Sequence, residues 1–162
     1  MLQEKSPCRE QSSIPEGPAA VCIHHLVELQ SHETPEAIAV IFGQRQLTYA
    51  ELNRQANQLC QLLRDQAVGP ETVVGICLDR SEHLVTLLLA IFKAGGAYVP
   101  LDPALPRERL HYMITDSGAK VVLTQSWHAD KFAEITTPIV CLDKVQDAGA
   151  CDLYSTDDPQ VP

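Results

Sequence analysis

The chain has 162 residues, of which 45% are hydrophobic and 20% charged, a composition typical of a globular protein rather than a disordered or fibrous one. Its formal net charge is −9 at pH 7, and no basic cluster is longer than Arg107-Glu108-Arg109. These features argue against nucleic acid and anionic membranes as partners, whereas phosphate ligands stay open because backbone N–H groups bind them without net positive charge.

The amino-terminal residues 1–20 contain prolines, serines and alternating charges without periodicity, which predicts a flexible leader or linker. They contain no apolar core of a secretory signal, and the most apolar run, residues 84–92, is too short to cross a bilayer. The six cysteines show no C-x-x-C spacing, which favours reduced thiols over a disulfide framework. We therefore expect a soluble cytoplasmic protein.

The ordered part is expected to begin near Val21 with a short amphipathic helix that Thr34-Pro35 ends. Residues 37–42 and 45–47 then predict a small β-hairpin around the turn at Gly43-Gln44. Thr48 and Glu51 have the spacing of a helix capping box, and apolar residues recur at helical spacing after them as far as Gly69-Pro70.

Strands and helices alternate through the rest of the chain. Strands are predicted at residues 72–78, 97–101, 119–123 and 138–142, and helices at 82–94, 107–117 and 127–134. Ser81 is the expected N-cap of the first of these helices, which ends at Gly95-Gly96. Repeated βαβ units predict an α/β fold, an open and mostly parallel sheet with helices on both faces, and residues 148–162 are expected to form a terminal loop.

Few residues suggest a site. The eight glycines fit neither G-x-G-x-x-G nor G-x-x-x-x-G-K-[ST], so neither nucleotide-binding loop is present. His25, Glu28 and His32 share one predicted helix face, which suggests either a metal site or, as we favour in the absence of a third strong ligand, a solvated polar face. The remaining predicted helices and loops carry isolated histidines, expected at the surface or at caps: His83, His111 and His128.

Nucleophiles are equally inconspicuous. Cys60 and Cys77 lie among apolar neighbours and are expected to be inert core residues, while Ser81 and Ser117 lack the G-x-S-x-G context of a hydrolase. Lys93 is either a cation that complements the negative end of its helix, which we favour, or a ligand for a phosphate or carboxylate. By themselves the residues indicate an α/β fragment without a visible catalytic site.

Two stretches carry a resemblance to a known family. LTYAEL at residues 47–52 and IFKAGGAYVPLDP at residues 91–103 resemble the first two core motifs of the amino-acid adenylation domains of nonribosomal peptide synthetases. These domains belong to the AMP-forming synthetase superfamily, which includes acyl-CoA ligases and luciferases. The AYVPLDP ending resembles the peptide-synthetase branch more than the acyl-CoA branch, and the resemblance runs from about Cys22 to about Ser126.

This resemblance implies a chemistry for a complete domain. Such domains bind ATP, magnesium and an amino acid, form an aminoacyl adenylate with release of pyrophosphate, and pass the acyl group to a phosphopantetheine thiol on a carrier domain. The family's Ser/Thr/Gly-rich phosphate loop, metal-binding acidic residue, ribose-binding Asp, specificity pocket and catalytic lysine have no counterpart in the 162 residues. We therefore expect no catalytic residue and no cofactor bound by this chain alone.

The family-motif residues are instead expected to have structural roles, ending helices, forming a buried strand and fixing the turn that leaves it. They are Leu47, Thr48, Tyr49, Glu51, Leu52, Lys93, Ala94, Gly95, Gly96, Tyr98, Pro100, Leu101, Asp102 and Pro103.

The resulting hypothesis is that residues 21–162 form the incomplete amino-terminal portion of an adenylation domain, truncated before the phosphate loop and inactive alone. A second hypothesis is a non-catalytic interaction module or split-enzyme half that binds a synthetase partner through an exposed sheet edge or helix face. A third is a fragment of an acyl-CoA ligase, which differs only in substrate class.

Overall fold

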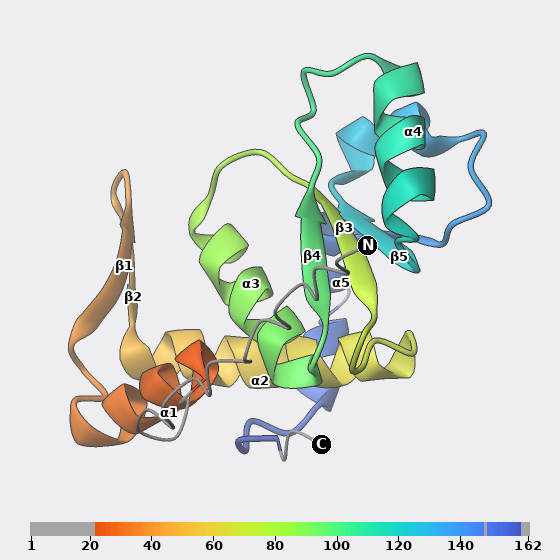
Figure 1. Cartoon of the computed structure of the whole chain (residues 1–162). Helices are drawn as coiled ribbons and strands as arrows, with labels where there is room; N and C mark the ends of the chain where they lie inside the picture. Colours follow the sequence, from red (N-terminus) through yellow and green to blue (C-terminus); the bar gives the residue numbers. More distant parts are fainter. Residues whose placement is uncertain (1–21, 148, 160–162) are drawn as a thin grey trace, which may run out of the picture.

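The computed structural model describes residues 22–147 and 149–159, so the leader expected at residues 1–20 lies outside the described part. A parallel four-stranded sheet forms its centre, with the strands in the order β4-β3-β5-β6 (Figure 1). Its strands are β3 (Val73–Cys77), β4 (Ala97–Pro100), β5 (Val121–Thr124) and β6 (Ile139–Cys141). Because β3 has β4 on one side and β5 on the other, the strand order reverses beside β3.

Helices cover both faces of this sheet, which confirms the predicted α/β architecture. One face packs against α2 (Tyr49–Asp65), α3 (Glu82–Ala94) and α5 (Leu142–Asp147), and the other against α4 (Arg107–Ser117) and the 3-10 helix η1 (Ser126–Phe132). Alternation along the strands builds the two cores, since Val121 and Leu123 face α2 and α3, whereas Val122 faces α4.

The helix–strand junction after α3 follows the expected backbone pattern. Gly95 adopts a left-handed conformation with φ of 88°, and the N–H of Gly96 donates to the carbonyl oxygen of Ile91 at 2.9 Å. The chain then enters β4 at once, where the N–H of Ala97 donates to the Thr72 carbonyl at 2.8 Å. A side chain at Gly95 would also meet the ring of Pro70 at 3.3 Å, so both conformation and space favour glycine there.

The amino-terminal elements are separate from the sheet. Helix α1 (Ile23–Glu33) and the antiparallel hairpin β1 (Ile38–Phe42) and β2 (Arg45–Thr48) pack on α2 and α3, as Figure 1 shows. The hairpin is as predicted, and its inner residues contact Leu52, Ala56 and Leu89 of these helices. Its outer side chains, Ile38, Ile41 and Phe42, are exposed.

Local hydrogen bonds explain how α2 begins. The Glu51 N–H donates to Thr48 Oγ1 at 3.2 Å, and the Thr48 N–H donates to Glu51 Oε2 at 2.9 Å, which confirms the predicted capping box. Ser81 is the N-cap residue of α3, as predicted, but its side chain makes no capping hydrogen bond. The next residue, Glu82, is held instead by an ion pair with Arg45 of the hairpin.

Two carboxyl-terminal segments differ in detail from their predictions. Residues 127–134 were predicted to form a helix, and the structure has a helix there, but it is the 3-10 helix η1, without a side-chain cap. The segment expected as a terminal loop contains a second 3-10 helix, η2 (Ala150–Leu153). Within the part of the chain that the structure describes, none of the helices combines the length and apolarity needed to cross a bilayer.

Candidate functional site

The carboxyl ends of β3, β4 and β5 meet at one edge of the sheet, next to the point where the strand order reverses. Open parallel sheets bind ligands at this position. The structure has an open cavity of about 700 Å³ there, which is lined by residues that follow β3 and β4: Leu78, Asp79, Arg80, Leu101, Asp102, Pro103, Ala104 and Leu105, with Ile76, Leu84, Pro100 and Met113. This carboxyl-edge cavity is the candidate functional site.

Asp79 lies at the rim of the cavity and joins β3 to the segment after β5. Its carboxylate accepts hydrogen bonds from Trp127 Nε1 at 3.0 Å and from His128 Nε2 at 3.1 Å, and its backbone N–H donates to Gln125 Oε1 at 3.0 Å. The hydrogen bonds from His128 and then Trp127 lower the pKa of Asp79 below its ordinary value. Asp79 is therefore an ionised acceptor at neutral pH rather than a proton donor.

The turn after β4, which ends the PLDP motif, forms the opposite wall. Asp102 Oδ1 accepts the N–H of Ala104 at 2.8 Å, and the Lys131 ammonium donates to the carbonyl oxygen of Pro103. These bonds fix the turn and occupy the Asp102 carboxylate. Arg80 is exposed beside the cavity, where a guanidinium favours an anionic group.

These residues do not by themselves fit a nucleotide with its metal ion. The turns that leave β3, β4 and β5 read LDRS, LDPAL and QSWH, so none contains the glycine that would bring backbone N–H groups close to phosphates. Nor is Ser117 or Cys77 paired with a base. Ser117 Oγ donates to the Ile114 carbonyl, and burial raises the pKa of the Cys77 thiol to about 11, as expected for an inert core cysteine.

A second polar group lies inside the molecule, away from the cavity. Lys93, the lysine of FKAGG, is 0% exposed, and its ammonium pairs with the carboxylate of Glu28 on α1 and, at 3.5 Å, with that of Asp158. Lys93 lies in the last turn of α3, as predicted, and of the two interpretations the structure shows the carboxylate partner, because the ammonium pairs with carboxylates of other elements. We call Lys93, Glu28 and Asp158, together with Asn53 and Asn57, the Lys93 cluster.

The amides of α2 complete the Lys93 cluster. Asp158 Oδ1 accepts from Asn53 Nδ2 at 2.7 Å and from Asn57 Nδ2 at 2.9 Å, and its other oxygen lies 3.0 Å from His32 Nε2. Burial alone would raise the pKa of Asp158, but hydrogen bonds from Asn57, Asn53 and His32, with the charge of Lys93, outweigh it and lower the pKa to about 2. The segment after η2 is thereby fastened to three helices.

The Lys93 cluster also bears on the helix face of His25, Glu28 and His32, which was interpreted as either a metal site or a solvated polar face. Glu28 is directed to Lys93 and His32 to Asp158, so His25, Glu28 and His32 do not form the metal site that their spacing suggested. Sequence reasoning missed Asn53, Asn57 and Asp158. A signal existed for the asparagines, because they lie four residues apart on the apolar face of α2 beside Leu52 and Ala56.

The family-motif residues occupy two places in the fold. Leu47, Thr48, Tyr49, Glu51 and Leu52 form the end of β2 and the first turn of α2, and the residues from Lys93 to Pro103 form the α3–β4 junction with the turn beyond it. In Figure 1 the first place lies where the hairpin meets α2, and the second where α3 leads into β4. That their role is structural stays a prediction.

Comparison with known proteins identifies the family of this chain. The family model described as AMP-binding enzyme matches residues 27–161. The chain therefore belongs to the AMP-binding enzyme family. Within it, the chain resembles the amino-terminal part of the adenylation domains of nonribosomal peptide synthetases, as its two motifs predicted.

Individual relatives support this placement. The chain is 50% identical over 127 residues to a linear gramicidin synthase of Brevibacillus parabrevis, covering 78% of this chain and 2% of the synthase. It is 46% identical over 131 residues to zwittermicin A synthase ZmaJ of Bacillus cereus, covering 80% of this chain and 25% of ZmaJ. Thus the chain spans at most a quarter of the length of these relatives.

Solved structures share the fold. The crystal structure of the nonribosomal peptide synthetase FmoA3 in its α-methyl-L-serine-AMP-bound form superposes with a TM-score of 0.79 at 31% identity, over 91% of this chain and 16% of FmoA3. The amino-terminal subdomain of NpsA from Klebsiella oxytoca superposes with a TM-score of 0.73 at 20% identity, over 86% of this chain and 35% of that subdomain.

Proposed function

We propose that this chain supplies the amino-terminal part of an amino-acid-activating adenylation domain for nonribosomal peptide synthesis, and that the 162 residues do not catalyse adenylation alone. The observation that carries the proposal is the FKAGGAYVPLDP junction, which links the buried Lys93 to the wall of the carboxyl-edge cavity within a family fold. The turns around that cavity lack phosphate-binding glycines, which supports the second half of the proposal.

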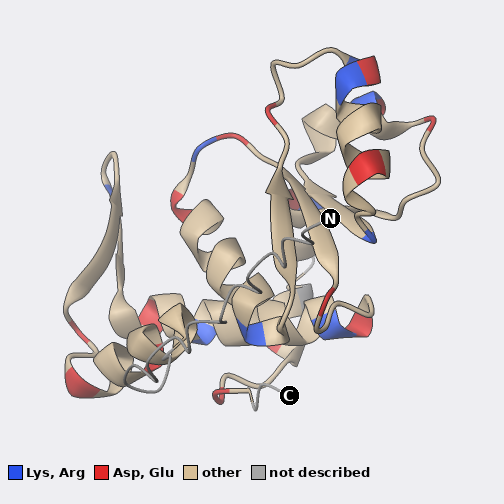
Figure 2. Cartoon of the chain, in the orientation of Figure 1, with Lys and Arg blue, Asp and Glu red and all other residues tan. Residues whose placement is uncertain are grey.

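A complete domain of this kind would use ATP and magnesium to activate an amino acid and would deliver it to a phosphopantetheine carrier. The name of one solved structure that shares the fold agrees with this, since NpsA-ThdA of Klebsiella oxytoca is an artificially fused adenylation–PCP di-domain. Protein partners also suit the surface. Figure 2 shows Lys and Arg spread over several elements among Asp and Glu, and the whole chain carries a net charge of −9. We place this function in the cytoplasm.

The test is amino-acid-dependent exchange of labelled pyrophosphate into ATP by the purified chain. We expect no exchange above background with any of the proteinogenic amino acids, whereas a complete adenylation domain assayed in parallel gives a clear signal. Exchange by the chain alone that depends on one amino acid would contradict the inactivity. Titration with ATP and magnesium, followed through the fluorescence of Trp127, which hydrogen-bonds Asp79 of the cavity, supplies a readout of binding without turnover.

The second candidate, a split-enzyme half or interaction module, is favoured by the edge of the sheet. Strand β4 is an edge strand, and Tyr98 on it is 40% exposed beside Phe92. An uncovered edge with an aromatic side chain is a ready surface for another chain. We propose that this edge receives the remainder of an adenylation domain when that remainder is supplied separately.

Binding of a separately expressed remainder of a related adenylation domain tests this idea. We expect saturable binding, and we expect this binding to restore pyrophosphate exchange. Tyr98→Lys is expected to weaken the binding, whereas Tyr112→Lys, at another exposed tyrosine on helix α4, is expected to leave it unchanged. If the chain stays monodisperse and shows no binding, the idea fails. Restored exchange with a fatty acid instead of an amino acid would favour the acyl-CoA ligase alternative.

A further inference from the structure

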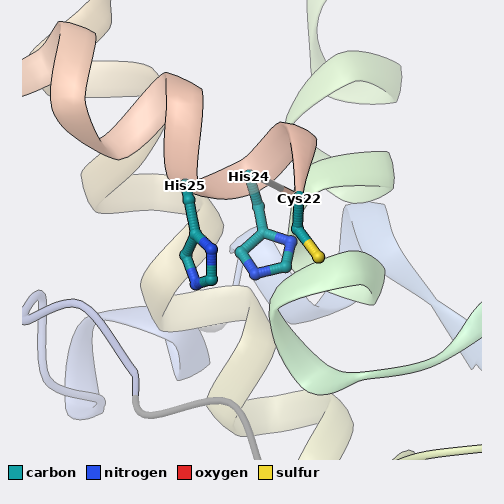
Figure 3. A group of neighbouring side chains, drawn as sticks. All are labelled: Cys22, His24 and His25. Atoms are coloured by element: carbon teal, nitrogen blue, oxygen red, sulfur yellow. The ribbon is translucent and has the colours of Figure 1, made fainter. Parts of the chain in front are cut away.

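Three metal-binding side chains meet at the start of α1, on residues that do not line the carboxyl-edge cavity. Cys22, His24 and His25 each offer one ligand atom, and these atoms all lie within 4.8 Å of one another. Figure 3 shows the ring of His24 between the sulfur of Cys22 and the ring of His25. The three residues come from the N-cap and first turn of one helix.

His24 gives an independent indication that a ligand belongs there. The residue is only 4% exposed, and its Nε2 is buried without a hydrogen-bond partner among the described residues. A buried ring nitrogen that finds no partner costs free energy, because it has lost its hydrogen bond to water. A bound metal ion would remove such a cost by accepting a nitrogen lone pair.

The neighbouring geometry allows the three groups to close on one ion. The rings of His24 and His25 already lie with centroids 4.2 Å apart. Ligand atoms around a tetrahedral zinc ion are about 3.3–3.8 Å apart, given its bond lengths. Cys22 and His25 are exposed, so small rotations of their side chains bring the atoms together without disturbing the core.

Charge near the trio does not oppose a cation strongly. The ammonium of Lys93, which lies near His24, is already paired with the Glu28 carboxylate one turn along α1. Cys22 is the N-cap residue of α1, so its sulfur lies next to the first turn that carries both imidazoles. A thiolate with two imidazoles is a ligand set preferred by zinc and other borderline-soft divalent ions, not by magnesium.

We propose that Cys22, His24 and His25 form a zinc site with one open coordination position, distinct from the magnesium that a complete adenylation domain would use. The ion joins the N-cap to the first turn of α1 and satisfies the buried nitrogen of His24. It takes no part in adenylation, so the proposal is independent of the activity proposed above.

Cobalt absorption of the full chain, reduced and freed of metal, tests the site. Co²⁺ is expected to give visible d–d bands of tetrahedral coordination and a near-ultraviolet sulfur-to-cobalt charge-transfer band, and Zn²⁺ is expected to displace it. Cys22→Ser abolishes the charge-transfer band. The matched control Cys151→Ser, which replaces another cysteine near a helix end, leaves it unchanged.

His25→Ala supplies the second measurement, since His25 is exposed and its removal leaves the core intact. We expect the zinc dissociation constant to rise by at least roughly 10-fold, the loss that even outer ligand contacts produce. Circular dichroism confirms that each variant is folded. A charge-transfer band that persists in Cys22→Ser, or zinc affinity that is unchanged in His25→Ala, overturns the proposal, as does the absence of cobalt bands in the parent chain.

Discussion

Two carboxylates in this chain accept similar sets of hydrogen bonds but differ in their neighbours and in the exposure of their side chains, which is 29% at Asp158 and 55% at Asp79. Asp158 accepts from two amides beside a fully buried lysine, whereas Asp79 accepts from an indole and an imidazole while its side chain remains 55% exposed. Both have a lowered pKa, but at Asp158 the bonds must first overcome burial. The difference shows that the surroundings of a carboxylate, and not the number of hydrogen bonds it accepts, decide how much those bonds contribute to the stability of the fold.

Removing the lysine gives the largest expected effect. In Lys93→Met the carboxylates of Glu28 and Asp158 lose their buried counter-charge, so we expect the free energy of unfolding to fall by about 3–5 kcal/mol. Urea denaturation measures it. The control Lys120→Met, at an exposed lysine, is expected to change stability little. A loss below about 1 kcal/mol for Lys93→Met would place the cluster in the same class as the surface pairs.

Acid is expected to weaken the same cluster. The pKa of Asp158 is about 2 in the folded chain and 3.8 ordinarily, so its stabilisation is complete above pH 3.8 and is lost as pH falls through 2. The shift corresponds to about 2 kcal/mol. Solvent screens the hydrogen bonds of Asp158, because it is an exposed residue, so we expect Asp158→Asn to lose less than this amount at neutral pH and to show a shallower decline as the pH falls from 3.8 towards 2. The free energy of unfolding is measured with urea at each pH. If it falls with pH equally in parent and variant, the assignment to Asp158 is contradicted.

The helix that carries the two amides depends on its capping box. Thr48→Ala removes the oxygen that accepts the Glu51 N–H, so we expect a loss of about 1 kcal/mol. Loss of the cap loosens the start of α2, the helix that carries Asn53 and Asn57, so we expect faster amide hydrogen exchange in its first turns. Thr136→Ala, in an exposed loop, is the matched control. Unchanged exchange in α2 would show that tertiary packing alone fixes its start.

The exposed carboxylate gives the smallest expected effect. Asp79→Asn is expected to cost less than about 1 kcal/mol, because solvent screens its bonds. Trp127 is the single tryptophan of the chain and hydrogen-bonds Asp79, so its fluorescence reports the protonation of that carboxyl directly. We expect an emission change with a midpoint below pH 3.8 that disappears in Asp79→Asn. A persistent change in the variant would assign it to another group.

The regular elements were predictable because their signals are local. The capping box at Thr48, the glycines that end α3 and the alternation of apolar residues in β5 all lie within a few residues of the structure they specify. The same stretches carried the family resemblance, and through it the fold. Even the span of α3, residues 82–94, follows from such signals.

The Lys93 cluster was not predictable, because its partners are distant in sequence. Lys93 lies in the last turn of α3, where a helix-end role is the local expectation, and only the packing of α1 brings Glu28 to it. Ser81 is the N-cap of α3 as its local sequence predicted, whereas the ion pair between Glu82 and Arg45 of the hairpin joins residues distant in sequence. The carboxyl-edge cavity was located only by assembling three strands, none of which carries a binding motif of its own.

The position of Asp158 in the chain has a consequence for biosynthesis. Lys93 and Asp158 are separated by 65 residues, which a ribosome translating about 5–20 residues per second adds in roughly 3–13 s. During that interval the nascent lysine has only Glu28 as a carboxylate partner within the described cluster, and the amides of α2 have no acceptor from Asp158. The Lys93 cluster is therefore complete only after the ribosome has added Asp158, near the end of the described chain.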